Sequence, residues 1–331
     1  MSLPEELRSR LKLPVVAAPM FLVSGPQLVI AACRAGVLGT FPALNARPIE
    51  ELDRWLKEIS AALGDQDAPF GVNLIVHRSN TRLAEDVEMV VRHRVPVVIT
   101  SVGHPGDIVE KVHAYGGIVW HDVTNLHHAR KAMASGVDGL ILVSAGAGGH
   151  AGTINPFALV PQVREFFAGT ILLAGAISDG RAVRAAEVLG ADLAWLGTRF
   201  IATRESLADP QYKQMLVEAQ AADIVYTDKV SGIHGNFIRQ SLEAAGIEWR
   251  AAGERKKVDM DLASRAAGEK EASAAEREAK AWKHIWSAGQ GVGSIHDIPT
   301  VAELVERLEA EYRRACDLPP FHGASGAPHA H

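Results

Sequence analysis

The chain has 331 residues, of which 47% are hydrophobic and 22% charged, and its formal net charge is −5 at pH 7. This length and apolar content suit a globular enzyme, built either as one large α/β barrel with extra helices or as two average domains. The net negative charge, with acidic and basic residues interspersed, argues against nucleic acid and anionic lipid as partners.

The cysteines and the N-terminus indicate further which kinds of protein and site to expect. Cys33 and Cys316 lie far apart without metal-ligand spacing, which argues against a disulfide framework and a metal site. Residues 1–10 lack the basic-then-apolar pattern of a signal peptide, and no apolar run approaches the roughly 18 residues of a membrane span. We therefore expect a soluble, cytoplasmic protein without a membrane partner.

Short apolar runs alternate with longer amphipathic stretches over the first 200 residues. Most runs are apolar at successive positions, which is typical of parallel strands covered on both faces. The stretches between them predict helices, for example 49–63 and 181–189. Eight such units predict a closed (β/α)₈ TIM barrel, with an open doubly wound sheet as the rival. The expected strands are 14–20, 37–43, 70–76, 95–103, 118–123, 138–144, 170–177 and 192–200.

The pattern changes after residue 200. Residues 201–250 are interpreted as helices and a loop, and the Ala-, Glu-, Lys- and Arg-rich stretch 254–281 as a solvated helix or hairpin. The glycine-rich segment WSAGQGVGSI (286–295) predicts a return to the barrel mouth, before a last amphipathic helix near 300–314. We thus expect a barrel over 1–240, an additional C-terminal helical segment over 241–315, and a disordered tail over 316–331.

The most informative motif is GAGGHAG (146–152), which places His150 in a loop almost free of side chains directly after an apolar run. Such a loop lets a planar ligand lie against the backbone, with the imidazole at its reactive edge. The alternative is a mobile connection that carries an ordinary surface histidine.

Two later loops suit a phosphate. In a (β/α)₈ barrel the loops after strands seven and eight commonly hold this group, and here they are AGAISDG (174–180) and LGTRF (196–200). Their backbone N–H groups and the Thr198 hydroxyl can converge on an anion. The alternative is that Gly175 and Gly197 only permit tight turns.

Other polar candidates stand at the remaining strand ends. The Asn73 amide can meet the edge of a heteroaromatic ring or cap the next helix. Met20 can form a soft wall for a flat ring or simply belong to the core. The further candidates are Ser101, His104, His121 and Asp122.

Five segments together carry a resemblance. AAPM (17–20), GVNL (71–74), the GAGGHAG loop, LLAGAISDG (172–180) and LGTRFIATRES (196–206) resemble the nitronate monooxygenase (2-nitropropane dioxygenase-like) flavoproteins, with a match over about 13–240. The resemblance implies an FMN-binding (β/α)₈ barrel and a catalytic role for His150. It also implies the cofactor-binding residues Ala18, Pro19 and Met20 along the isoalloxazine ring, Asn73 and Asp122 at its edge, Gly148 and Gly149 near the reactive centre, and Ala174, Gly175, Ala176, Gly197 and Thr198 around the phosphate.

The implied reaction oxidises a nitroalkane or alkyl nitronate with O₂ to a carbonyl compound and nitrite. His150 would remove a proton from a neutral nitroalkane, or anchor a nitronate that arrives as the anion. Ser101, His104 and His121 are assigned to the substrate pocket. Some family members carry lysine where this chain has Asp122, so a cation near the reduced ring is missing unless His121 or another residue supplies it.

Two other functions stay open on the same barrel. Flavin-dependent enoyl-thioester and quinone reductases share the barrel and the histidine loop but take a hydride from NAD(P)H, so the resemblance does not fix the reaction. A noncatalytic flavin-binding protein is the other alternative. The sequence leaves a homo-oligomer open.

Overall fold

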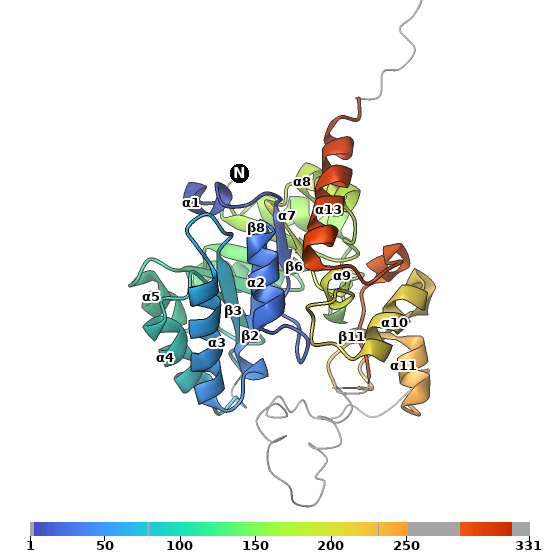
Figure 1. Cartoon of the computed structure of the whole chain (residues 1–331), viewed down its shortest axis with the longest axis horizontal. Helices are drawn as coiled ribbons and strands as arrows, with labels where there is room; N and C mark the ends of the chain where they lie inside the picture. The colour runs from blue at the N-terminus through green and yellow to red at the C-terminus, as the bar shows by residue number, and fades with distance from the viewer. Residues whose placement is uncertain (1–2, 78–79, 231, 251–284, 320–331) are drawn as a thin grey trace, which may run out of the picture.

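The computed structural model describes residues 3–77, 80–230, 232–250 and 285–319. Eight parallel strands close into a barrel in the order β1-β2-β3-β4-β5-β6-β8-β9. Figure 1 shows this barrel from the side, with helices in front of its strands. β1 pairs with both β2 and β9, which completes the ring and excludes the open sheet. The TIM barrel expected from the sequence is confirmed. Its strands are Val15–Ala17 (β1), Leu38–Pro42 (β2), Phe70–Ile75 (β3), Val97–Ser101 (β4), Ile118–Val123 (β5), Gly139–Val143 (β6), Thr170–Ala174 (β8) and Leu193–Leu196 (β9).

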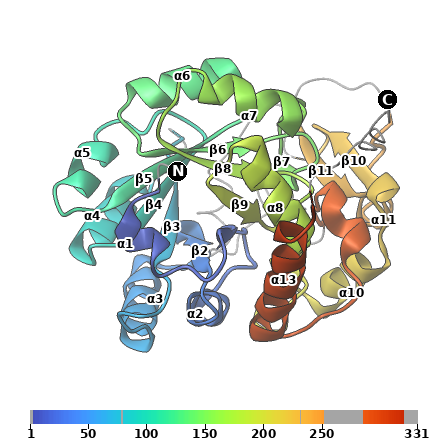
Figure 2. The same cartoon turned by 90° about the horizontal axis from the view of Figure 1, so that it is seen from above.

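Helices surround this barrel (Figure 2). Their apolar faces pack on the outer side of the strands in one continuous core, as amphipathic helices do. The helices of the ring are Pro26–Arg34 (α2), Ile49–Ala62 (α3), Leu83–Arg92 (α4), Ile108–His113 (α5), Leu126–Ala134 (α6), Pro156–Arg164 (α7), Gly180–Leu189 (α8) and Val301–Cys316 (α13).

The last helix of the ring comes from the part of the chain that we expected outside the barrel. The eighth strand is followed only by the four-residue α9 (Thr198–Ile201), which is too short to cover it. α13 packs between α8 and α2 instead (Figure 2). The apolar stripe of α13 lies in the main core, so 301–316 completes the barrel. Its buried residues are Val301, Leu304, Val305 and Leu308.

The interior of the barrel is filled at its N-terminal end. A cluster that includes Trp120, Ile99 and Leu172 packs inside the strands, and Leu7 of α1 (Glu5–Arg8) joins it from below. A Cβ atom on Gly139 would lie 2.5 Å from Trp120 Cδ1, so the absence of a side chain there makes room for the indole. In the described part of the barrel, the room for a ligand therefore lies at the C-terminal end of the strands.

The described residues 201–230, 232–250 and 285–300 form an insertion beside the barrel mouth. Its elements are α10 (Pro210–Glu218), η2 (Ala221–Asp223), β10 (Ile224–Thr227), β11 (Gly235–Ile238), α11 (Arg239–Ala244) and η4 (Gln290–Ser294). The remaining short helix, η1 (Ala43–Asn45), follows β2 in the barrel. The sequence predicted only helices and a loop over 201–250. The structure instead has a hairpin there, β10–β11, which pairs with β7 (Gly149–His150) to form a separate antiparallel sheet.

Two expected segments lie outside the described residues: the charged helix or hairpin at 254–281, and most of the tail at 316–331. Among the described residues, no helix combines the length and apolar character needed to span a membrane.

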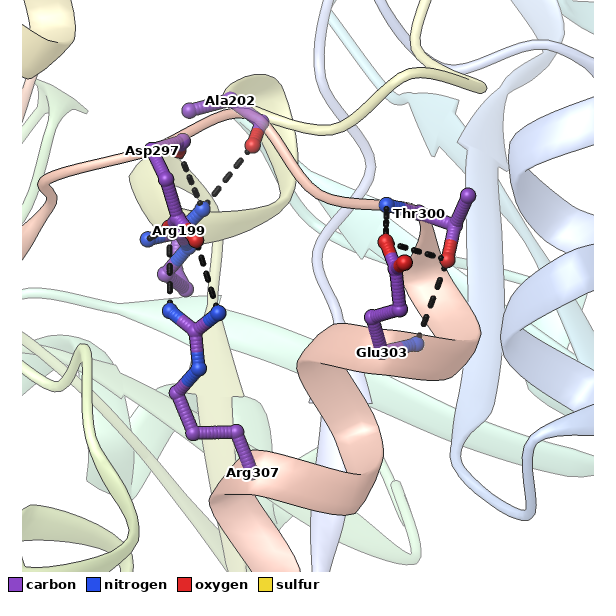
Figure 3. Close-up of polar contacts among 6 residues, drawn as sticks. All are labelled: Arg199, Ala202, Asp297, Thr300, Glu303 and Arg307. Carbon is purple, nitrogen blue, oxygen red and sulfur yellow. Dashed lines mark hydrogen bonds and ion pairs between the residues drawn. The ribbon is translucent and has the colours of Figure 1, made fainter.

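A polar network connects α9 to the segment that leads into α13 and to α13 itself (Figure 3). Arg199, only 2% exposed, donates from Nη2 to the carbonyl oxygen of Asp297 at 2.9 Å. The Asp297 carboxylate accepts two hydrogen bonds from Arg307, at 3.0 and 2.7 Å. Thr300 and Glu303 form a capping box that begins α13. The segment after the eighth strand is therefore held by the helix that closes the ring.

Candidate active site

A cavity of about 360 Å³ opens at the C-terminal ends of the barrel strands. Side chains and backbone from the strand ends line one side, and the segment 285–291 of the insertion lines the other. The position agrees with the ligand site of (β/α)₈ barrels in general. The residues expected from the sequence that line this cavity are Ala18, Pro19, Met20, Asn73, Ser101, Asp122, Gly148, Gly149, His150, Ala174, Gly175, Ala176, Gly197 and Thr198.

His121 and His104, which we assigned to the substrate pocket, do not line the cavity. Alternate residues of a strand face opposite sides, and Asp122 of β5 faces the cavity, so His121 points outward. Its Nδ1 lies 2.8 Å from Thr100 Oγ1, and burial lowers the pKa of His121 to about 4. His104 contacts the Ser135 hydroxyl at 3.2 Å on the outer side. His121 therefore cannot supply the missing cation.

His150 lies on a short strand rather than on a mobile loop. β7 pairs with β11, where His150 stands opposite Gly235. The Nδ2 atom of Asn236 donates to the carbonyl oxygen of Ala147 at 2.7 Å, and the Tyr226 hydroxyl donates to that of Ala151 at 3.0 Å. This pairing and the place of His150 in the cavity lining argue against the alternative of an ordinary surface histidine on a loop.

Burial lowers the pKa of His150 to about 4. Removal of the imidazole from water disfavours its charged form, so the ring is neutral at neutral pH. A neutral imidazole can accept a proton from a bound carbon acid.

Glycines allow three backbone segments to meet beside His150. A Cβ atom on Gly148 would lie 2.8 Å from the Gly289 nitrogen, and one on Gly235 would lie 2.8 Å from the Gly149 oxygen. Contacts this short to backbone atoms exclude a side chain at either position. The glycines of the histidine loop thus serve the packing of the 285–291 segment and of β11 as well as the cavity.

The loops after β8 and β9 offer backbone N–H donors to the cavity. The N–H groups of Ala176, Ile177, Ser178 and Thr198 have no backbone acceptor within the described part of the chain. The backbone turns sharply here, with φ of +138° at Gly175. Such a cluster of N–H groups is suited to an oxygen-rich anion.

The first turn of α8 itself is already satisfied by carboxylates. The N–H group of Gly180 donates to Glu311 Oε2 at 2.8 Å, and that of Ala182 donates to Asp179 Oδ1 at 2.8 Å. An anion would therefore rest on the preceding loop rather than on the start of this helix.

The wall contributed by the insertion is aromatic, and sequence reasoning missed it. The rings of Tyr212 and Trp286 stack with centroids 5.1 Å apart and planes 8° from parallel, and both line the cavity. The tryptophan stands at the start of the glycine-rich return, which is a usable signal. Nothing in the sequence around Tyr212 pointed to a site.

The opposite wall holds the only carboxylate among the described lining residues, Asp122. Burial raises the pKa of Asp122 to about 6, against a smaller lowering by the nearby Ser101 hydroxyl and Val102 N–H group. No lysine or arginine lines the cavity within the described ranges. The site thus pairs a neutral histidine with an acid that titrates near neutrality.

Comparison with known proteins agrees with this architecture. A family model described as nitronate monooxygenase matches residues 6–311. The nitronate monooxygenase of Paraburkholderia phytofirmans is 26% identical over 352 residues, covering 92% of this chain and 93% of that protein.

Other similar proteins carry different names. A (3aS,4S,5R,7aS)-5-hydroxy-7a-methyl-1-oxo-octahydro-1H-indene-4-carboxyl-CoA dehydrogenase of Mycobacterium tuberculosis is 32% identical over 233 residues. The match covers 69% of this chain and only 64% of that relative, less than two thirds of its length. The solved structure of FabK from Thermotoga maritima superimposes with a TM-score of 0.75 at 26% identity, covering 94% of this chain and 96% of that one. The chain is an oxidoreductase that belongs to the nitronate monooxygenase family, whose members depend on flavin.

Proposed function

We propose that this protein is an FMN-dependent enzyme that oxidises nitroalkanes or alkyl nitronates with O₂ to carbonyl compounds and nitrite. The observation that carries the proposal is the imidazole of His150, kept neutral by burial and facing a cavity at the barrel mouth. The family model and the P. phytofirmans relative support the same reaction.

The residues around the cavity fit FMN. The phosphate would lie on the N–H groups of Ala176, Ile177, Ser178 and Thr198, which have no backbone acceptor among the described residues, and the ring along 18–20. The Thr198 hydroxyl oxygen accepts from the Gly289 N–H group at 2.9 Å, which leaves its own proton available to an anion. When bound, FMN supplies the electron transfer between substrate and oxygen.

His150 would hold the reacting proton. The imidazole accepts the proton on the carbon beside the nitro group, and the short β7–β11 pairing keeps the side chain in place during that transfer. A substrate that enters as a nitronate has already lost this proton, so His150 then only orients it. The stacked Tyr212 and Trp286 exclude water from the far side of the cavity.

A panel of substrates tests the proposal. Purified holoenzyme in air should release nitrite from short nitroalkanes and their nitronates, and the nitrite should depend on oxygen. Absence of nitrite across the panel would contradict the proposal.

NAD(P)H-dependent reduction of an enoyl or related thioester is the second candidate. It is favoured by the likeness to the CoA dehydrogenase of M. tuberculosis and to FabK. Oxidation of NADH or NADPH by the holoenzyme with crotonyl-CoA, in the absence of oxygen, would support this candidate.

A further inference from the structure

An aromatic pair closes the insertion side of the cavity. The rings of Tyr212 and Trp286 lie 8° from parallel, and both side chains line the cavity. Tyr212 is only 6% exposed, whereas Trp286 is half-buried. Because one face of the indole rests on the Tyr212 ring, a ligand in the cavity can meet only its other face or its edge.

Hydrogen bonds fix the position of this pair. The N–H group of Trp286 donates to Ser241 Oγ at 2.7 Å, and its carbonyl oxygen accepts from the Ile238 N–H group at 2.9 Å. The Tyr212 hydroxyl donates to the carbonyl oxygen of Ser287, the next residue along the chain. Since both backbone groups of Trp286 are bonded and its ring is stacked, the indole forms a firm wall rather than a side chain on a loose loop.

Strand β11 holds this wall and His150 together. β7 places His150 opposite Gly235, and the bond to Trp286 lies at Ile238, three residues further along β11. At roughly 3.3 Å per residue, these two attachment points are about 10 Å apart. His150 and Trp286 both line the cavity, so the base of the proposed reaction and the indole bound the same space from two points of one strand.

The space that they bound is small and apolar. The cavity volume of about 360 Å³ is near the lower end of the range for ligand pockets, roughly 300–1,000 Å³, and the proposed flavin ring takes part of it. Ile201 and Ile285 line the cavity on the side of the insertion, and Met20 packs with Trp286 against the same apolar cluster. What remains suits a short apolar substituent on the reacting carbon.

We propose that Trp286 determines substrate specificity: it ends the space that extends from His150 and restricts the enzyme to nitronates with short alkyl chains. The inference rests on the proposed function, which leaves the chain length open. A longer chain would have to displace the indole, and overpacking of this kind opposes binding. The alternative is that the aromatic stack only stabilises the insertion.

The test measures selectivity between two chain lengths. Holoenzyme in air receives ethyl nitronate or hexyl nitronate, and kcat/KM is taken from the release of nitrite. The wild-type protein should favour ethyl nitronate by at least about tenfold. Trp286→Ala should raise the hexyl-to-ethyl ratio at least about tenfold, the effect of burying about two further methylene groups. Trp286→Phe, which keeps a ring on Tyr212, should raise it by a smaller factor.

The ratio separates specificity from stability. Both values are measured on the same preparation, so a loss of folded or FMN-loaded protein cancels, and a merely structural role of Trp286 would leave the ratio unchanged. Trp249→Ala is the matched control, because Trp249 belongs to the same insertion but packs against a different apolar cluster and does not line the cavity. This variant should keep the wild-type ratio.

A binding series gives a second readout that needs no turnover. Propionate and heptanoate have the shapes of the two nitronates, and their binding to the holoenzyme is followed by the change in flavin absorbance. Propionate should bind more tightly to the wild-type protein, and Trp286→Ala should shift this preference toward heptanoate. The wild-type series needs no variant to fold.

Equal selectivity in the wild-type protein and Trp286→Ala would overturn the role of Trp286 and leave the proposed function standing. A wild-type protein that uses hexyl nitronate as well as ethyl nitronate would do the same. Absence of nitrite from both nitronates would overturn the proposed function and the inference with it.

Discussion

The state of His150 yields the sharpest prediction about catalysis. With the pKa at about 4 instead of 6.5, about one imidazole in a thousand is protonated at pH 7, compared with about a quarter for an exposed histidine. The base form is needed for proton removal, so kcat/KM for a neutral nitroalkane should be constant above about pH 6 and decline as the pH falls toward 4. Oxygen consumption measured from pH 4 to 8 gives this profile.

Replacing the imidazole separates its role as a base from its role as an anchor. His150→Asn keeps a polar group of similar reach but removes the base, so kcat/KM for the nitroalkane should fall about 10²- to 10⁴-fold. The corresponding nitronate, which has no proton to lose, should lose less than about tenfold. Equal losses for both substrates would refute the assignment as a base. A midpoint near 6.5 in the wild-type profile would refute the effect of burial.

Three further predictions concern the packing around the site. Gly148→Ala places a Cβ atom 2.8 Å from the Gly289 backbone, so the protein should retain less FMN through gel filtration. The control variant Gly64→Ala, whose new Cβ atom has its nearest contact at 3.8 Å, should retain as much FMN as the wild-type protein. Asp297→Ala removes the carboxylate between Arg199 and Arg307, and it should lower the free energy of unfolding, measured by urea titration, by about 1–3 kcal/mol. An unchanged urea midpoint would contradict a stabilising role for the network in Figure 3. Leu304→Ala truncates a side chain of α13 that is only 1% exposed, and it should lower the free energy of unfolding by about 2–5 kcal/mol. The control Val188→Ala, on the exposed side of α8, should lower it by less than about 0.5 kcal/mol. Similar losses for the two variants would show that α13 does not belong to the barrel core.

The barrel could be predicted from the sequence because each of its strands is a short apolar run between amphipathic segments. Runs such as 70–76 and 118–123 coincide closely with β3 and β5. The position of α13 could not be predicted, since an apolar stripe shows that a helix packs against something but not where. The β10–β11 hairpin was missed because its four-residue strands pair with only two residues of a glycine-rich loop.

Some residues of the cavity could likewise be predicted from the sequence, and others could not. Motifs with fixed places on strand ends, such as GVNL with Asn73 and GAGGHAG with His150, lie together around it. His121 was misplaced because strands buried on both faces do not reveal in their sequence which residues point inward. Tyr212 was missed because its place at the cavity depends on how the insertion folds back, a contact between residues distant in sequence.

The most direct test of the account follows the yellow colour of the holoenzyme without oxygen. Anaerobic mixing with propyl nitronate should bleach the flavin absorbance rapidly, and readmission of oxygen should restore it with release of nitrite. NADH and NADPH should leave the absorbance unchanged over the same time. Prompt bleaching by either nicotinamide, with none by the nitronate, would contradict nitronate oxidation and support the reductase.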